Sequence, residues 1–427
     1  MPTAREAARD NLRGSTGVEE LPIGRRVAYW RGRRKMSQQV FADRLGKSKS
    51  WVDKVERGVR RLDKFSVVYE IADVLQLDVA LLLGKDPDRR DGTTTCMDQV
   101  EVEDMRAALE RYDQISAFFY MPPEPPPLEA MRKSVSHAWL SYQHAKYSVL
   151  GKSLPKLLRE AQAADIGYTG SDQGREAAHL LSQVYQIVSS VLRKIGEHDL
   201  SWLAADRAIA VSQRAGDPLL AGTATYRVAL ALLALGRARP ALEVNVNIAN
   251  RLAPGTGGEP ITPERLSVYG MLLLQGAMAA ARLGDSATVR DLIGGASEAA
   301  RLMGGEGNHY WTNFGPTNVE LHRAAAAVEL GEGRQAIDIH DRLNPESFLT
   351  LLPERRAHHY IDISRGLAQV GDVARASEML LEGDRLAPSE IRCRPIAHEV
   401  LSDVLRRTRG TPPPAVAELA EHMGVGV

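Results

Sequence analysis

The chain is 427 residues long, and its 54 Lys and Arg residues balance 54 Asp and Glu residues, so the formal net charge is zero. This length predicts two or more domains, and a hydrophobic content of 44% allows a sizeable core. The sequence has no signal peptide and no apolar run of membrane-spanning length, so we expect no membrane partner. Its two cysteines, Cys96 and Cys393, cannot form a disulfide framework or a zinc site alone, which favours a reducing cytoplasm.

Positive charge is concentrated near the N-terminus. Residues 21–65 contain 14 Lys and Arg residues against 4 Asp and Glu residues, so the rest of the chain carries the balancing negative charge. A basic module joined to an acidic body is typical of a nucleic-acid-binding protein with a separate sensing domain. A run of charged residues by itself usually indicates only a solvent-exposed surface. Specific evidence for nucleic-acid binding therefore has to come from a sequence motif.

The first 20 residues have little apolar content, and we expect residues 1–20 to form a mobile arm. A folded module follows over residues 21–84. Its first helix is predicted over residues 23–35, and residues 36–58 predict two short helices joined by a tight turn.

The ends of these two short helices carry clear signals. Ser37 and Ser48 suit the two N-caps, and Gly46 and Gly58 suit the left-handed conformation in which helices often end. The second helix then presents small polar and basic side chains outward, which suits the major groove of DNA. The outward residues are Lys49, Ser50, Asp53, Lys54 and Arg57.

This segment resembles the helix-turn-helix of the Xre (Cro/cI-like) family. With its flanks, residues 23–35 and 59–84, it covers about 60 residues and includes a region similar to the family's fifth helix. The residues that carry the resemblance are Ser37-Gln38-Gln39, Ala42, Leu45-Gly46, Ser48 and Val55-Glu56-Arg57-Gly58.

The resemblance implies roles for individual residues. Lys49, Ser50 and Lys54 would face base edges. Arg31 would pair with Glu56 and so hold the first helix against the third. The residues that would contact phosphates are Gln38, Arg57, Arg60 and Arg61.

Asp53 is unusual on a helix that faces DNA. Its carboxylate could accept a hydrogen bond from a cytosine amino group. It could instead pair with Lys49 or Arg57 on the same helix, and we favour this second interpretation.

The remaining chain divides into a linker and a long helical domain. Residues 85–127 predict a polar linker with one helix, over residues 98–120, and a proline-rich end. Residues 128–427 are rich in Ala and Leu and show no convincing alternating strand. A glycine closes an apolar helix and precedes another helix at intervals of 40 to 48 residues, which indicates an internal repeat. These glycines are Gly196, Gly236, Gly284, Gly331 and Gly371.

Two of the repeats end in a similar way, with Ala241 and Pro254 in one and Ala376 and Pro388 in the other. This pattern resembles the second half of a tetratricopeptide (TPR) unit, although these units are longer and degenerate. Stacked TPR-like hairpins form a curved solenoid with a concave ligand-binding surface. The predicted fold is therefore all-α, with a five-helix Xre-type helix-turn-helix domain followed by a TPR-like α-solenoid.

One segment of the repeat domain, residues 309–318, combines three aromatic residues with two asparagines just before a helix. An asparagine side chain can satisfy the backbone of an extended peptide, and aromatic rings can form apolar pockets. The alternative is an ordered loop in which the asparagines cap backbone groups. The candidate ligand-binding residues are Asn313, Asn318, His322, Tyr310, Trp311 and Phe314.

No motif indicates a catalytic site, a metal or a cofactor, so we do not expect an enzyme. The combination of domains resembles bacterial regulators that sense peptide pheromones, and the Arg- and Ala-rich composition resembles their actinobacterial relatives. This implies a cytoplasmic, nucleoid-associated homodimer that binds a double-stranded DNA operator and senses a peptide or small-molecule effector. The alternative is an adaptor whose repeats grip a protein partner and whose DNA contact is secondary.

Overall fold

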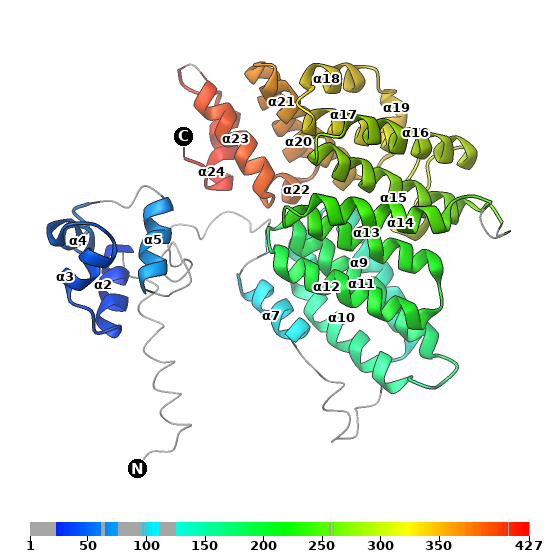
Figure 1. Ribbon diagram of the computed structural model, residues 1–427, viewed down its shortest axis with the longest axis horizontal. Coiled ribbons are helices and arrows are strands. Elements are labelled where there is room, and N and C mark those ends of the chain that lie inside the picture. Colours follow the sequence, from blue (N-terminus) through cyan, green and yellow to red (C-terminus); the bar gives the residue numbers. More distant parts are fainter. Residues whose placement is uncertain are drawn as a thin grey trace, which may run out of the picture. The chain divides into compact units, whose positions relative to one another are not determined.

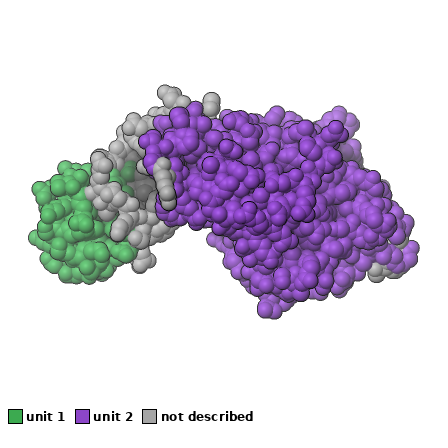
Figure 2. All heavy atoms as spheres, turned by 90° about the horizontal axis from the view of Figure 1, so that it is seen from above, with its two compact units in different colours: residues 1–93 green, residues 94–427 purple. Residues whose placement is uncertain are grey.

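The structure is a computed structural model that describes residues 23–60, 65–75, 96–97, 99–110, 125–255, 258, 260–408 and 410–426. The chain forms two compact units, residues 1–93 and residues 94–427 (Figure 2). Throughout the described residues the regular secondary structure is helical, which confirms the all-α class. The expected N-terminal arm, Arg61, the region of the fifth helix after Leu75 and most of the linker lie outside the described residues.

Four helices of the N-terminal unit are described. They are α2 (Ile23–Arg33), α3 (Gln38–Arg44), α4 (Lys49–Glu56) and α5 (Phe65–Leu75). Apolar side chains spaced three or four residues apart give each helix a single face to bury. These faces form one small core, with Val27, Phe41, Val52, Ile71 and Leu75 almost fully buried.

The second unit is a stack of antiparallel helical hairpins, coloured from cyan through green to red in Figure 1. The first helix of each hairpin contacts the first helix of the next, from α11 through α13, α15, α17 and α20 to α23. Helix α20 also contacts α9, so the stack curves back toward its own beginning. The helices are α7 (Gln99–Glu110), α9 (Leu128–Gln143), α10 (Tyr147–Gly167), α11 (Gly174–Lys194), α12 (His198–Ala215), α13 (Pro218–Ala234), α14 (Ala238–Leu252), α15 (Pro263–Arg282), α16 (Ser286–Met303), η3 (His309–Trp311), α17 (Pro316–Glu329), α18 (Gly333–Asp341), α19 (Pro345–Thr350), α20 (Pro353–Gln369), α21 (Val373–Leu386), α22 (Pro388–Arg392), α23 (Pro395–Arg407) and α24 (Pro414–Met423).

The five repeat glycines lie at the turns inside the hairpins, as their spacing predicts. Each has a positive φ, between 75° and 91°, and each separates the two helices of one hairpin. Glycine adopts this left-handed conformation without the steric cost that a Cβ imposes. Ala241 and Ala376, in the second helices of two hairpins, are fully buried, so their small size allows close packing.

Helix α7, which lies within the segment expected as a linker, packs against α10 and α12 of the second unit. Its apolar face is used for this contact, because Met105, Ala108 and Leu109 are fully buried. No helix among the described residues is both long and apolar enough to cross a membrane.

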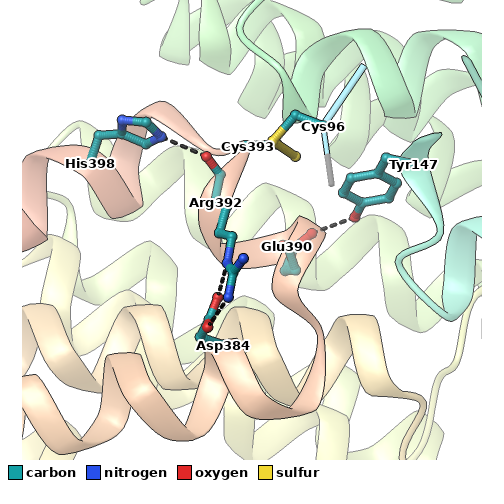
Figure 3. Close-up of a disulfide and its surroundings, with 7 residues drawn as sticks. All are labelled: Cys96, Tyr147, Asp384, Glu390, Arg392, Cys393 and His398. Atoms are coloured by element: carbon teal, nitrogen blue, oxygen red, sulfur yellow. Dashed lines mark hydrogen bonds and ion pairs between the residues drawn. A yellow bond between two sulfur atoms is a disulfide. The ribbon is translucent and has the colours of Figure 1, made fainter. Parts of the chain in front are cut away.

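The two cysteines form a disulfide within the second unit (Figure 3). Cys96 precedes α7 and Cys393 follows α22, with 297 residues of sequence separation and a Cα–Cα distance of 5.4 Å. Beside the bond, the guanidinium of Arg392 donates two hydrogen bonds of 2.7 Å to Asp384. From the sequence, the two cysteines alone were not expected to form a disulfide framework, and a reducing cytoplasm was favoured. In the structure the folding of the hairpins brings the two sulfur atoms together.

Candidate nucleic-acid interface and central pocket

Helices α3 and α4 form the predicted pair of short helices and the turn between them. The Ser37 Oγ accepts a hydrogen bond from the Val40 backbone at 3.2 Å, and the Ser48 Oγ accepts one from Trp51 at 3.1 Å. Gly46 has a φ of 61°, which closes α3 in the left-handed conformation. Both N-caps and the turn glycine are as predicted from the sequence.

The outer face of α4 carries three of the residues predicted to read DNA. Lys49, Ser50 and Lys54 are exposed, while Val52 and Val55 on the opposite face are buried in the core of the unit. The same helix therefore combines an apolar anchor with a polar and basic surface, a pattern that suits insertion into the major groove.

A buried ion pair holds α4 against α2. The guanidinium of Arg31 donates to both carboxylate oxygens of Glu56, at 2.6 and 3.0 Å, and only 6% of the Glu56 side chain is exposed. The side-chain nitrogen of Gln38 also donates to Glu56, at 2.8 Å. Gln38, a predicted phosphate contact, is thus partly engaged inside the unit, and the Arg31–Glu56 pair implied by the family resemblance is present.

The other residues predicted to contact phosphates have surface positions. Arg57 pairs with Asp53 at 2.6 Å, so Asp53 follows the interpretation that we favoured, a contact on its own helix. The Arg60 guanidinium lies 5.9 Å from the centre of the Trp51 ring, an arrangement typical of a cation–π contact. Arg61 lies outside the described residues.

The second unit encloses a central pocket of about 390 Å³. Its wall is built by the first helices of successive hairpins, which contribute residues at helical spacing. Helix α15 supplies residues 271, 275, 278 and 282, and α17 supplies residues 318, 322, 325 and 329. This regular spacing places one face of each helix on the pocket, as expected for the concave side of a solenoid.

The predicted ligand-binding residues divide between the pocket and the core. Trp311, Asn313, Asn318 and His322 line the pocket. Tyr310 and Phe314 do not: the Tyr310 hydroxyl donates to Asp217 at 2.7 Å, and Phe314 is fully buried in the core.

Asn318 and His322 serve the structure of the wall. Asn318 is fully buried, and its side-chain nitrogen donates to the Asn313 carbonyl at 2.8 Å. His322 is 3% exposed, and its Nδ1 contacts the Asn318 carbonyl at 2.9 Å. Because a carbonyl only accepts, Nδ1 carries the proton and Nε2 accepts from the Gln275 amide at 3.2 Å. Burial lowers the pKa of His322 to about 3, in agreement with this neutral form.

A cluster of buried charges closes one side of the pocket. The Lys194 ammonium is completely buried and pairs with Glu354 and, at 2.5 Å, with Glu390. Arg394 also donates to Glu390, at 2.6 Å. Burial lowers the pKa of Lys194 to about 8 although both carboxylates act to raise it. Burial acts to raise the pKa of Glu354, but Lys194 and neighbouring arginines outweigh this effect and hold the pKa at about 2.

This cluster also contains the one grouping of metal-ligand side chains among the described residues. Ligand atoms of Glu354, His358 and Glu390 lie within 4.8 Å of one another. The ammonium of Lys194, however, contacts both carboxylates, and Arg394 contacts Glu390, so two cations of the chain itself already balance the two negative charges. The arrangement is therefore a buried ion-pair network rather than a favourable site for a metal ion.

The sequence analysis did not identify three arginines of the pocket wall, Arg193, Arg227 and Arg355. One signal was present. Arg227 is the only charged residue in the apolar sequence of α13, PLLAGTATYRVALALLA. A charged side chain in such a helix is rarely buried without a partner or a function.

Comparison with known proteins supports the assignment of the N-terminal unit. A family described as a helix-turn-helix domain matches residues 22–83. No curated protein and no solved structure matches the chain. The helix-turn-helix match points to DNA as a partner and to a DNA-binding regulator rather than an enzyme.

Proposed function

We propose that this protein is a sequence-specific transcriptional regulator of the Xre type, in which α4 reads the DNA operator. The observation that carries the proposal is the exposed face of α4, which presents Lys49, Ser50 and Lys54. The Arg31–Glu56 ion pair fixes α4 in place. Base edges in the major groove are read by short polar and basic side chains of this kind. Arg57, Arg60 and Arg61 would add phosphate contacts.

The second unit is proposed to act as a TPR-like sensor with its effector, a peptide or small molecule, in the central pocket. The pocket lies on the concave wall of the stacked hairpins and has the volume of a small-molecule site. An effector regulates DNA binding only if it has unequal affinity for two conformations of the protein. The degenerate repeats and the composition are consistent with an actinobacterial regulator of this architecture.

The regulator is also proposed to work as a homodimer in the cytoplasm, associated with the nucleoid. One helix-turn-helix unit covers a half-site, and two-fold dimers commonly read half-sites whose centres are about 34–36 Å apart. The apolar face of α7 is already buried against α10 and α12, so the dimer contact would come from other parts of the second unit.

Selection from a pool of random double-stranded DNA tests this proposal. The purified full-length chain is expected to enrich a palindromic sequence and to bind it as a dimer. Recovery of random sequences only, with an affinity set entirely by salt, would contradict sequence-specific binding. A stable co-purifying protein together with that result would favour the adaptor function instead.

A further inference from the structure

The central pocket contains more positive charge than its carboxylates neutralise. Four of its basic residues form ion pairs: Lys194 and Arg394 with Glu390, and Arg282 and Arg365 with Glu329. Three others, Arg193, Arg227 and Arg355, form no ion pair with any described carboxylate, and the Nε atom of each lacks a hydrogen-bond partner.

Arg227 is the most deeply buried of these three arginines, with 6% of its surface exposed. Its guanidinium lies 4.5 Å from the Tyr226 ring centre and 5.2 Å from that of Trp139. Stacking on aromatic rings fixes the plane of the guanidinium but supplies no negative charge. A buried guanidinium without a hydrogen-bond acceptor is unfavourable. Because folding has already removed water from this guanidinium, an anionic ligand that accepts its hydrogen bonds would bind strongly there.

Arg193 and Arg355 extend the same positive region from two other helices, α11 and α20. Burial lowers the pKa of Arg193, and Arg227 lowers it further, so the two guanidinium groups repel each other. Burial, together with Arg355, also lowers the pKa of His322, and this histidine adds no charge of its own. An anion bound between these groups would offset their repulsion.

Apolar side chains line part of the same wall, beside polar and acidic residues such as Gln275 and Asp362. Leu230, Met271, Met278 and Trp311 line the same cavity. Burial of an apolar group against these side chains would stabilise a complex, and their flexible thioethers adapt to ligands of different shape. The pocket is thus suited to a ligand with one charged end and one apolar end.

We propose that the central pocket binds a small organic anion, whose carboxylate or phosphate group is held by Arg193, Arg227 and Arg355 while its apolar part contacts Met271 and Trp311. The proposal that an anion binds in this pocket does not depend on the proposed DNA-binding function. The further statement that this anion is the effector rests on the proposed function.

Calorimetric titration of the full-length chain with two matched pairs of probes tests the site. The first pair is cinnamate and cinnamamide, which have nearly the same shape and differ mainly in charge. The second pair is phenyl phosphate and phenol, which lacks the phosphate, so this pair measures the contribution of the phosphate group as a whole. At least one anion is expected to bind roughly 10- to 100-fold more tightly than its neutral partner, as charge-assisted hydrogen bonds predict. Comparison of the two pairs shows whether the site prefers a carboxylate or a phosphate.

Variants locate the binding site within the chain. Arg227→Gln and Arg355→Gln should each remove most of the preference for the anion, and Arg227→Lys should keep part of it. The matched control is Arg239→Gln, which removes an exposed arginine of α14 and should bind like the wild type. Thermal unfolding of each variant separates lost binding from lost folding, and a folded Arg355→Gln protein suffices if Arg227→Gln does not fold.

Equal affinity for the charged and neutral probes, no binding of either anion, or unchanged binding in both folded glutamine variants would overturn the inference. DNA binding is measured on the same samples. If the protein prefers an anion but does not bind DNA specifically, the proposed regulator is contradicted and the anion site stands. If it binds DNA specifically but does not prefer an anion, the anion site is contradicted and the proposed regulator stands.

Discussion

Glu56 lies at the end of α4, and its carboxylate accepts three hydrogen bonds, two from Arg31 and one from Gln38. These contacts join three helices of a unit whose core is small. Removal of one partner of a buried pair leaves the other charge without compensation, which costs more than the pair itself contributes. The orientation of the exposed side of α4 therefore depends on this carboxylate.

We expect Glu56→Ala to destabilise the N-terminal unit by about 3–5 kcal/mol. The control is Asp53→Ala, which removes a partly exposed pair with Arg57 on the same helix and should cost at most about 1 kcal/mol. Amide hydrogen exchange in α2 and α4 of the full-length chain measures both effects. An equal and small loss of protection in the two variants would show that the Arg31–Glu56 pair does not hold the unit together.

Buried histidines make the second unit sensitive to acid. The pKa of His322 is lowered from 6.5 to about 3, chiefly by burial, and burial also lowers the pKa values of His358 and His359. The unfolded chain therefore binds protons that the folded chain does not as the pH falls below 6.5. Stability contributed by these neutral histidines is fully present above this value and decreases as the pH falls toward 3.

For His322 alone, acidification from about pH 7 to about pH 5 is expected to cost about 2 kcal/mol. Chemical unfolding of the second unit at a series of pH values measures this loss. His322→Gln removes the titrating group and should give a shallower dependence on pH. A variant with the same pH dependence as the wild type would show that the pKa of His322 in the folded protein is not lowered.

At the scale of single residues, the sequence predicts the local contacts better than the ligand site. The caps of Ser37 and Ser48 involve atoms three residues apart, so the sequence contains all the information that is needed. Asn318, His322 and Arg227 each have a local contact, but each also has a partner on another helix: Met271, Gln275 and Trp139, respectively. The sequence does not show whether a polar residue of the inner face bonds to the wall or points into the pocket.

Helix α15 and the segment that precedes α17 illustrate packing at the scale of elements. The turn glycines predicted where hairpins lie, because the left-handed conformation is a local requirement. Phe314, by contrast, was predicted to contact a ligand, but it packs against Gly270 of α15. A Cβ atom at Gly270 would lie only 2.0 Å from the Phe314 ring.

We expect Gly270→Ala to destabilise the second unit by about 1–3 kcal/mol, because the added Cβ forces the fully buried Phe314 ring to shift within the core. The control is Gly294→Ala in α16, where a Cβ would meet no atom within 4 Å. This substitution should be neutral or stabilise the helix by up to about 1 kcal/mol. Thermal unfolding of both variants gives the comparison, and equal stability would show that Phe314 can be displaced without cost.

At the scale of the whole molecule, contacts between distant parts of the chain were the least predictable. The curved stack brings α20 close to α9 and Lys194 to Glu390, and it places Cys96 beside Cys393. Each of these pairs is separated by well over a hundred residues. The repeat predicts that hairpins stack, but the degree of curvature depends on many small packing angles that no single motif encodes.

The disulfide links two distant parts of the chain, and its contribution to stability can be measured. A cross-link across 297 residues restricts the unfolded chain, and reduction is expected to lower the stability of the second unit by about 2–4 kcal/mol. Chemical unfolding with and without a thiol reductant measures the change. Cys96→Ser and Cys393→Ser should each show the same loss, and reductant should have no further effect on them. An unchanged unfolding curve after reduction of the wild type would mean that the tether does not stabilise the fold.

The most direct test of the regulator is the ratio of affinities for the selected operator and a scrambled duplex, measured at one salt concentration. In Lys49→Ala/Ser50→Ala/Lys54→Ala this ratio should fall at least tenfold, because each good base contact contributes about 1–3 kcal/mol of discrimination. Arg60→Ala, the control, should weaken binding to both duplexes similarly and leave the ratio unchanged. A triple variant that folds and keeps the wild-type ratio would contradict the claim that α4 reads the operator.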